Sequence, residues 1–418
     1  MKRTKFAGVF MKRNLSLKIN SLLTMFPIVA VIGVRQCGKT TLAKNLKPDW
    51  LYIDLEKPTD FNMLDFDPEF FFEKHPKHII IDEAQLYPKL FAILRGIIDA
   101  DREQTGRFIL TGSSSPELIK NITESLAGRI AIVELGTFKA NEIFAKPLSN
   151  FYQILQQPLT ANSFAELGVA QLSLQNIQTA WLQGGYPEPI LKNSKDFYLQ
   201  WMENYENTYI NRDLARLYPK LNKIAYQRFL SILCKLSGTI LNKSDLARTL
   251  EISEGTVREY LKIAEDTFLW RAIPSYEKSK IKSIIKMPKG NIRDSGLLHT
   301  LLRITNKEQL FRDPIIGLSF EGFVIEELIK GLQATMLTHW SYYYYRTRGG
   351  AEVDLILTGP FGVLPIEIKY GSKITKTQLV ALEDFALQNN SPFALLINQA
   401  KEACWLNKTV FQLPVNYL

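Results

Sequence analysis

A short apolar run that ends in a glycine-rich loop constrains the fold of this chain more than any other feature. Residues 27–33, Pro-Ile-Val-Ala-Val-Ile-Gly, are typical of a parallel strand buried on both faces. The loop that follows fits G-x-x-x-x-G-K-[ST] from Gly33 to Thr40, and residues 41–46 are predicted to form a helix. The order strand, loop and helix predicts an α/β fold with an anion-binding loop at the end of a buried strand.

The residue types in this loop suit a nucleoside triphosphate. Glycine at Gly33 and Gly38 lets backbone N–H groups surround the phosphates, and the helix N-terminus adds its positive dipole. Lys39 is expected to reach the β- and γ-phosphates and Thr40 to ligate Mg²⁺, with Thr41 next in the helix. The sequence therefore predicts ATP and Mg²⁺ as cofactors bound at this loop.

A second apolar strand ends in two adjacent carboxylates. Residues 78–81, His-Ile-Ile-Ile, are followed by Asp82 and Glu83, at the strand end where open α/β sheets bind ligands. The pair resembles a Walker B element, in which Asp82 holds magnesium through water and Glu83 polarises the attacking water. A strand that ends in a helix cap looks the same in isolation. Because the pair follows a phosphate loop, it indicates ATP hydrolysis.

A third buried strand, residues 107–112, ends in hydroxyl side chains. In ATPases of the AAA+ kind, which this region resembles, a polar residue here senses the γ-phosphate. Ser113 is the candidate, with Thr111 or Ser114 as alternatives, and a turn cap gives the same pattern. Arg129 is a candidate contact to nucleotide in the same chain or, as an arginine finger, in a neighbouring subunit, although surface arginines at helix ends are common. No second arginine stands out, so the sequence does not support a homo-oligomeric ring.

After residue 140 the alternation of strands and helices stops. Residues 141–217 are predicted to be helical with polar connections, as in the lid or connector of an ATPase. Within them, residues 184–188, Gly-Gly-Tyr-Pro-Glu, predict a turn between helices. No chemistry follows from that turn alone.

Residues 218–312 contain the spacing of a helix-turn-helix. Two helical patterns, residues 243–250 and 252–261, begin near Ser244 and Ser253, which we expect to be N-caps. A strand of a wing follows them. If the second helix enters a major groove, its exposed candidates are Glu254, Thr256, Arg258 and Glu259. Two of these are acidic, and a winged-helix module that only packs or binds protein has the same pattern.

The formal net charge of +9 lies entirely in the middle of the chain. Residues 211–310 hold 19 Lys and Arg against 10 Asp and Glu, and the rest of the chain is balanced. Such a surplus can neutralise a phosphate backbone, so residues 243–293 are predicted to contact DNA, although a solvated basic loop is equally compatible. The densest cations are Lys278, Lys280, Lys282, Lys286, Lys289 and Arg293.

The C-terminal part begins with an amphipathic helix at residues 320–331. A strand at residues 340–345, a Gly349-Gly350 turn and a returning strand at residues 352–357 predict a hairpin. A further strand follows at residues 363–370, in which alternation points Glu367 and Lys369 to the same face.

This order of acids and lysine resembles that of the PD-(D/E)xK nuclease superfamily. In that chemistry Asp354 and Glu367 would hold Mg²⁺ or Mn²⁺, Glu321 would orient a metal-bound water, and Lys369 would activate it or stabilise charge on the phosphate. Asp354 and Glu367 interrupt apolar strands, where unpaired carboxylates are costly, and this favours an acidic site. A retained scaffold that binds without cutting is the alternative.

Taken in order, the motifs resemble a known prokaryotic family. They run from the phosphate loop through Thr-Gly-Ser-Ser-Ser, Ser-Leu-Ala-Gly-Arg and Gly-Gly-Tyr-Pro-Glu to Arg-Gly-Gly-Ala-Glu-Val-Asp and Ile-Glu-Ile-Lys. The chain is similar to AAA-type ATP-binding proteins whose C-terminal domain of unknown function resembles archaeal Holliday-junction resolvases. The resemblance implies ATP hydrolysis by Asp82 and Glu83, and a nuclease-like site whose helix carboxylate is Glu321 or Glu327.

We therefore predict an α/β chain of four parts in the cytoplasm. Its three cysteines form no C-x-x-C pair, its four histidines suggest no metal cluster, and no apolar run reaches the roughly 18 to 20 residues of a membrane span. The predicted parts are a P-loop AAA-type ATPase core at 1–140, a helical lid or connector at 141–217, a winged-helix-like basic segment at 218–312, and a restriction-endonuclease-like domain at 313–418.

Two functional hypotheses follow. The first is an ATPase that couples its nucleotide state to DNA binding and metal-dependent DNA cleavage. The second is a nucleotide-switched regulatory protein that binds DNA or protein and carries an inactive nuclease fold. Lys369 separates them, because an inert scaffold has no evident need for a lysine beside two metal-binding acids. A P-loop kinase is a weaker hypothesis, since no acceptor site for a small molecule is recognisable.

Overall fold

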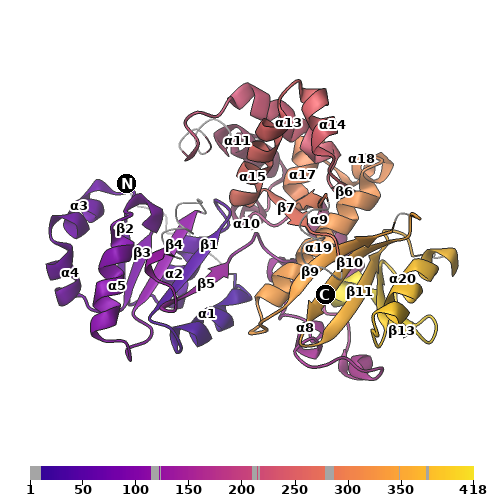
Figure 1. Ribbon diagram of the computed structural model, residues 1–418, viewed down its shortest axis with the longest axis horizontal. Coiled ribbons are helices and arrows are strands. Elements are labelled where there is room, and N and C mark those ends of the chain that lie inside the picture. Colours follow the sequence, from indigo (N-terminus) through magenta and orange to yellow (C-terminus); the bar gives the residue numbers. More distant parts are fainter. Residues whose placement is uncertain are drawn as a thin grey trace.

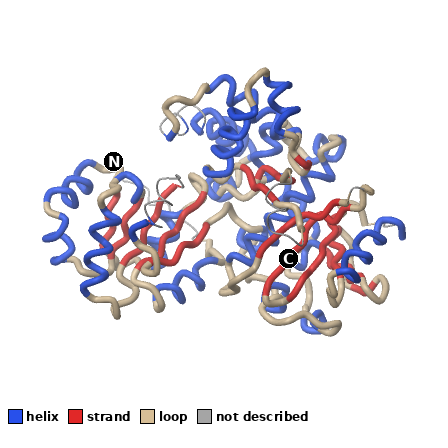
Figure 2. The backbone as a smooth tube through the Cα atoms, viewed as in Figure 1, coloured by secondary structure: helices blue, strands red, loops and turns tan. Residues whose placement is uncertain are grey.

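Three β-sheets organise the described part of the chain (Figure 1). The computed structural model describes residues 11–113, 122, 124–209, 214, 217–277, 287–347, 349–372 and 376–418. Figure 2 shows the two larger sheets on opposite sides of the molecule, with a mostly helical middle segment beside them. Within the described residues, no helix combines the length and apolar character needed to cross a membrane.

The N-terminal sheet is parallel and has the strand order β2-β3-β4-β1-β5. Its central strand, β1, is buried along its whole length, as the apolar run predicts. Because neighbouring strands run the same way, the phosphate loop and the ends of β3 and β4 lie at one edge of the sheet. The strands are β1 (Ile28–Gly33), β2 (Leu51–Asp54), β3 (Ile79–Asp82), β4 (Phe108–Ser113) and β5 (Ile130–Glu134).

Helices cover both faces of this sheet because alternate residues of β1 point in opposite directions. Val29 and Val31 pack in the same core as α1 and α2, whereas Ile28 and Ala30 pack in the core that contains α5. The helices are α1 (Leu15–Leu23), α2 (Lys39–Leu46), α3 (Pro58–Phe66), α4 (Pro68–Lys74) and α5 (Leu90–Ala100).

The segment expected to form one lid, residues 141–217, is instead divided between two cores. Its first half packs against the C-terminal sheet, where Phe164 stacks on Phe411 with ring centroids 4.7 Å apart. Its second half packs with the phosphate-loop side of the molecule through Tyr186 and Met202. The large apolar side chains of the first half bury against the sheet they reach, so no single lid forms. The helices are α7 (Ala140–Ile143), α8 (Phe151–Ile154), α9 (Leu174–Gln183), α10 (Pro187–Lys192) and α11 (Lys195–Thr208).

A small antiparallel sheet with the strand order β6-β8-β7 accompanies the two helices of the predicted helix-turn-helix. Ser253 caps α15 as expected, by accepting a hydrogen bond from the Thr256 N–H. Asn242 rather than Ser244 caps α14, and it accepts from the Ser244 and Asp245 N–H groups. The elements are α13 (Lys223–Lys235), β6 (Thr239–Ile240), α14 (Lys243–Leu250), α15 (Glu254–Asp266), β7 (Trp270–Ile273), β8 (Lys289–Ile292), α17 (Ser295–Leu301) and α18 (Lys307–Arg312).

The C-terminal sheet is mixed, with the strand order β13-β14-β12-β11-β10-β9. The hairpin predicted from Gly349-Gly350 is β9 and β10, and β11 pairs antiparallel to β10 but parallel to β12. Helix α19 packs on one face of this sheet and α20 on the other. The elements are α19 (Ile316–Gln333), β9 (Ser341–Arg346), β10 (Glu352–Gly359), β11 (Gly362–Ile368), α20 (Lys376–Gln388), β12 (Ala394–Asn398), β13 (Cys404–Trp405) and β14 (Val410–Pro414).

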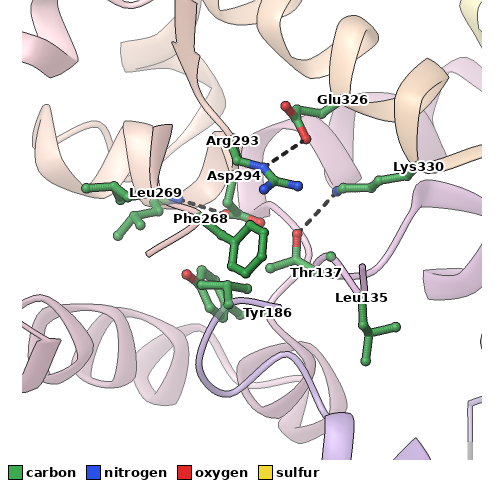
Figure 3. Close-up of a pocket in the computed structure, with 12 residues that line it drawn as sticks. Leu135, Thr137, Tyr186, Phe268, Leu269, Arg293, Asp294, Glu326 and Lys330 are labelled. Carbon is green, nitrogen blue, oxygen red and sulfur yellow. Dashed lines mark hydrogen bonds and ion pairs between the residues drawn. The ribbon is translucent and has the colours of Figure 1, made fainter. Parts of the chain in front are cut away.

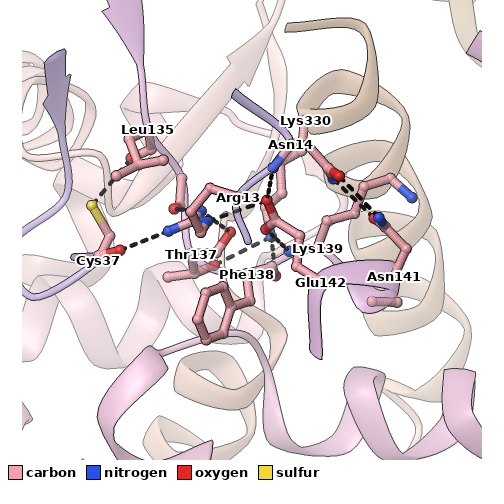
Figure 4. A network of polar contacts seen from close by, with 12 residues as sticks. Arg13, Asn14, Cys37, Leu135, Thr137, Phe138, Lys139, Asn141, Glu142 and Lys330 are labelled. Carbon is pink, nitrogen blue, oxygen red and sulfur yellow. Dashed lines mark hydrogen bonds and ion pairs between the residues drawn. The ribbon is translucent and has the colours of Figure 1, made fainter. Parts of the chain in front are cut away.

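Buried polar contacts join the N-terminal sheet to helix α19 (Figure 4). Arg13 donates to the carbonyls of Cys37 (2.9 Å) and Gly136 (2.8 Å) and pairs with Glu142 (3.2 Å). Lys139 lies 3.3 Å from the carboxylate of Glu327, which also accepts the Ala140 N–H at 3.0 Å. The chain that leaves β5 is therefore fixed against both the phosphate loop and α19.

A second group of charges connects the N-terminal sheet, the small sheet and helix α19. Glu134, the last residue of β5, pairs with Arg271 on β7 (3.4 Å) and with Arg293, which directly follows β8. Both arginines also pair with Glu326 on α19. Burial alone raises the pKa of Glu134, but Arg293 and Arg271 outweigh it and lower this pKa to about 2. We call these four residues the junction network.

The lowered pKa of Glu134 predicts a specific acid sensitivity. An ordinary glutamate titrates near 4.5, so this group stabilises the fold above that pH and loses its contribution as the pH falls toward 2. We expect Glu134→Gln to lower the free energy of unfolding at pH 7 by on the order of 2 kcal/mol, because two arginines lose a charged partner. Urea unfolding between pH 7 and pH 3 should then show a flatter pH dependence in the variant than in the wild type. An unchanged pH dependence would contradict this account of the network.

Candidate functional site

The phosphate loop has the backbone that its glycines predict. A Cβ atom on Gly33 would lie 2.1 Å from the Leu135 carbonyl oxygen, so only glycine fits beside β5. Gly38 has a φ of 92°, in the left-handed region, and begins helix α2. Lys39 is buried and donates hydrogen bonds to the Gly33 and Val34 carbonyls, both at 3.1 Å, while Thr41 is exposed in the first turn.

Asp82 collects three hydroxyl groups at the same sheet edge. Thr40 donates to it at 2.8 Å and Tyr52 at 2.7 Å, and Thr111 also donates to it. Asp82 is 5% exposed, so these contacts satisfy a carboxylate that would otherwise be costly to bury. The Thr40 hydroxyl and the Asp82 carboxylate, 2.8 Å apart, suit Mg²⁺, which prefers oxygen ligands. The sequence patterns predicted Thr40 and Asp82, but they gave no role to Tyr52.

Glu83 and Ser113 lie at the edges expected for their predicted roles. Glu83 follows β3 with a φ of 55° and accepts a hydrogen bond from Gln85. The strand register pairs Ser113 with Gly33, next to the loop. The side chain of Ser113, and Ser114 as a whole, lie outside the described part of the chain.

The structure separates Arg129 from the phosphate loop of the same chain. Arg129 directly precedes β5, whose first residue pairs with Ile28, at the opposite end of β1 from Gly33. Six residues of strand span about 20 Å. Its guanidinium instead pairs with both carboxylate oxygens of Asp99, at 2.8 and 2.9 Å. The proposed contact of Arg129 with nucleotide in its own chain is therefore wrong, because the parallel register places it at the other edge of the sheet.

The Gly-Gly-Tyr-Pro-Glu turn at residues 184–188, which showed no chemistry in the sequence, packs beside the phosphate loop. The Gly185 carbonyl accepts the Phe138 N–H at 2.7 Å, and the Gly185 N–H donates to Asp294 at 2.8 Å. A cavity opens next to this turn, between Val34 of the phosphate loop and the arginine that follows β8. Figure 3 shows Tyr186, Thr137, Arg293, Glu326 and Lys330 around it. The phosphate loop and the junction network therefore line the same cavity.

A second site lies where β8, α19, β10 and β11 meet. Lys289 of β8 lies 2.7 Å from Glu321, 3.0 Å from Glu352 and 3.7 Å from Asp354, measured from its ammonium nitrogen to a carboxylate oxygen. Lys369 lies 2.5 Å from Glu367 and 3.6 Å from Asp354. The register of β10 shifts between Val353 and Ile356, so Asp354 lies in an irregular part of the strand. We call these six charged residues the acidic site.

Burial and mutual repulsion dominate the protonation of the acidic site. Burial, followed by the charge of Asp354, raises the pKa of Glu321 to about 8 although Lys289 opposes the shift. The same two causes raise the pKa of Glu367 to about 7 against the effect of Lys369. Burial and the charge of Asp354 together thus outweigh the effect of the two lysines, a condition that a bound cation would relieve.

The geometry distinguishes the two candidate helix carboxylates. Glu321 lies in the acidic site, whereas Glu327 pairs with Lys139 at the junction with the N-terminal sheet. Among the described residues, no three His, Cys, Asp or Glu side chains are grouped in a way that could hold a metal ion by themselves. Within the described residues, the buried Oε2 of Glu367 nevertheless has no hydrogen-bond partner, so Glu367 retains capacity for a cation, whereas Oδ2 of Asp354 accepts the Ile368 N–H at 2.8 Å.

Two of the six cations in the basic cluster predicted to contact DNA are paired with carboxylates. Lys289 is 3% exposed and lies in the acidic site, and Arg293, whose side chain is 10% exposed, is paired within the junction network. These two cations are therefore unavailable to a phosphate backbone, because each neutralises buried carboxylates. The other four residues of that cluster, Lys278, Lys280, Lys282 and Lys286, lie outside the described residues.

The exposed cations of the helix-turn-helix are paired within their own helices. Arg258 lies 3.4 Å from Glu254 and Lys262 lies 3.2 Å from Asp266. Arg248 pairs with Asp245 at 3.1 Å. Glu254, Arg258 and Glu259 are exposed and Thr256 is partly buried, so the predicted face is accessible but has little excess charge.

Comparison with known proteins identifies the parts of the chain. Residues 25–144 match an AAA domain, residues 174–308 a domain of unknown function (DUF8612), and residues 316–418 a domain of unknown function (DUF4143). Over 384 residues the chain is 32% identical to the uncharacterized proteins Rv2008c of Mycobacterium tuberculosis and Mb2031c of Mycobacterium bovis. The alignment covers 90% of this chain and 78% of each relative.

The chain belongs to the family of these two mycobacterial proteins. Its N-terminal part is an AAA-type P-loop ATPase domain, which confirms the predicted ATPase class of this part of the chain. Such a domain binds nucleotide. The C-terminal match carries no activity in its description.

Solved structures resemble the chain only loosely. The Walker-type ATPase paby2304 of Pyrococcus abyssi is 16% identical, with a TM-score of 0.46 over 70% of this chain and 96% of that one. The RuvB Holliday junction branch migration motor of Thermotoga maritima is 15% identical, with a TM-score of 0.29 over 63% and 91%. At these scores the likenesses assign no residue or activity to this chain.

The AAA domain predicts the effect of removing the carboxylate after β3. We expect Glu83→Gln to reduce the turnover of ATP by about 100-fold or more, the usual loss when a group that activates water is removed. Binding of ATP should stay within about threefold, because the variant keeps the side-chain shape and the loop is unchanged. Phosphate release and fluorescent-nucleotide binding measure the two effects.

The matched control is Glu56→Gln, an exposed glutamate that follows β2 at the same sheet edge. It should leave turnover unchanged. Equal losses in both variants would show that Glu83 has no special role.

Proposed function

We propose that this protein hydrolyses ATP and uses its nucleotide state to control DNA binding and metal-dependent DNA cleavage at the acidic site. In the AAA domain, Lys39 would hold the β- and γ-phosphates, Thr40 and Asp82 would hold Mg²⁺, and Glu83 would orient the attacking water. Ser113 or Thr111 would detect the γ-phosphate. The observation that carries the proposal is the junction network, which joins the strand beside the phosphate loop to β8 and α19, two of the four elements that build the acidic site.

Coupling is supported by the positions of the network residues. Glu134 ends β5 and pairs in register with Ile32, one residue before the phosphate loop. Its partner Arg293 directly follows β8, the strand that carries Lys289. Glu326 lies on α19, the helix that carries Glu321. A shift of β5 on nucleotide binding would therefore act on both sides of the acidic site through buried charges that are costly to separate.

The residues of the acidic site suit a divalent cation and a phosphodiester. Asp354 and Glu367 would hold Mg²⁺ or Mn²⁺, and the unpaired Glu367 Oε2 supports this assignment. A bound divalent cation would lower the pKa of an attacking water and stabilise the charge that develops on phosphate. Lys369, whose side chain is one-third exposed, would contact the phosphate at the mouth of the site. Glu321 would orient a water molecule.

DNA is the proposed substrate because the chain carries its excess positive charge in the segment next to this site. Residues 243–293 and the C-terminal sheet would share the contact. Two of its densest cations, Lys289 and Arg293, are already paired with carboxylates, so we expect the remaining contact to be modest and strongly dependent on salt.

One observation favours a second candidate, a nucleotide-switched regulatory protein with an inactive nuclease fold. Lys289 already lies among the carboxylates, and no ready three-acid metal group is found in the described part of the chain. In that case the acidic site would be a buried structural charge cluster that binds DNA or protein without cutting.

Strand scission of labelled single-stranded, duplex and branched DNA distinguishes the two candidates. With Mg²⁺ or Mn²⁺ we expect cleavage by the wild type, and a loss of at least about 100-fold in Asp354→Asn. Asp384→Asn, an exposed aspartate on α20, is the matched control and should cut normally. If no DNA is cut while ATP turnover is intact, the regulatory candidate replaces the nuclease.

The coupling itself is tested by Arg293→Lys, which keeps the charge but loses the planar fork that reaches both Glu134 and Glu326. We expect the ratio of cleavage with ATP to cleavage without ATP to fall toward one. ATP turnover should stay within about threefold, because the phosphate loop is untouched. Arg303→Lys, at an arginine whose side chain is 69% exposed, controls for the substitution. An unchanged ratio in Arg293→Lys would contradict coupling through this network.

A further inference from the structure

The acidic site takes one of its charged groups from outside the C-terminal sheet. Lys289 belongs to β8 of the middle segment, and its side chain is 4% exposed. Its ammonium group lies between Glu321 (2.7 Å), Glu352 (3.0 Å) and Asp354 (3.7 Å). Three carboxylates around one point are the surroundings in which proteins place a cation, and here that cation is a lysine.

Lys289 is held in this position by its own sheet. Strand β8 lies between β6 and β7 and pairs with both of them. Withdrawing Lys289 would leave Glu321, which is also buried, without its counter-charge. The lysine is therefore a fixed part of the site.

The other side of the site carries the second lysine. Lys369 reaches Oε1 of Glu367 and lies 3.6 Å from Asp354, and a third of its side chain is exposed. Oε2 of Glu367 is buried and has no hydrogen-bond partner in the described structure.

The charges indicate how many metal ions the site can take. Metal binding requires ionised carboxylates. With all four ionised, Glu321, Glu352, Asp354 and Glu367 bring four negative charges, and the two lysines offset two of them, while Arg346 also lies 3.9 Å from Glu352. At most two negative charges remain, which suits one divalent cation and not two.

We propose that Lys289 replaces a second metal ion, so that the acidic site binds a single divalent cation between Asp354 and Glu367. The site is then complete only when the middle segment is docked on the C-terminal sheet. This inference rests on the metal site of the proposed function and adds its stoichiometry and its dependence on a second part of the chain.

The test counts Mn²⁺ ions bound to the full-length protein without nucleotide, from the free-Mn²⁺ signal in electron paramagnetic resonance. Ions at the acidic site are those lost in Asp354→Asn, which separates them from any ion at the phosphate loop. We expect one such ion in the wild type, two in Lys289→Met and one in Lys289→Arg, which keeps the charge. Lys235→Met, at an exposed lysine on α13, should match the wild type.

Each outcome bears on a different claim. One Asp354-dependent ion in both the wild type and Lys289→Met would overturn the inference and leave the proposed metal site intact. No such ion in the wild type would overturn the metal site itself. If Lys289→Met then gained one ion, Lys289 would be a plug and the inference would also be wrong.

The wild type alone provides a second readout, which does not depend on whether Lys289→Met folds. The spectrum of bound Mn²⁺ should be that of an isolated ion. A spin-coupled pair of ions that disappears in Asp354→Asn would overturn the inference.

Discussion

One short strand, β8, places a positive charge in each of two buried acidic groups, and the rest of the structure depends on this arrangement. Lys289 at its start reaches the acidic site, and Arg293 just past its end reaches the junction network. Buried charges are costly unless they are paired, so the strand cannot move far from either group. The middle segment is thereby fixed against the AAA domain and the C-terminal sheet at the same time.

This constraint gives the proposed coupling a physical basis. Communication between distant sites requires an element whose position both sites influence. β5 borders the phosphate loop, α19 carries both Glu321 and Glu326, and β8 contacts the two groups of acids. The cavity beside Tyr186 lies at the same junction.

Sequence motifs were sufficient to predict a site when its residues are adjacent in the chain. The phosphate loop and the Asp82-Glu83 pair each occupy a few consecutive positions, and the structure brings Thr40 and Asp82 within hydrogen-bond distance. The AAA family match confirms that part. Asp354, Glu367 and Lys369 could be predicted to lie close together for the same reason, because a hairpin and a strand alternation relate them.

What the sequence could not provide was the partner of each charge. Lys289 and Arg293 belong to a run of similar cations, and a formal charge does not reveal which carboxylate lies opposite in space. Arg129 was predicted to lie near the nucleotide because it is close to a motif in the sequence. Closeness in the sequence does not determine at which edge of the sheet a residue lies. The division of residues 141–217 between two cores depends on which apolar surface each helix reaches.

Amide hydrogen exchange, measured with and without a non-hydrolysable ATP analogue, tests whether nucleotide binding is coupled to the acidic site through the junction network. The account predicts altered protection in β8 and α19 as well as in the phosphate loop, and a change confined to the AAA domain would contradict it.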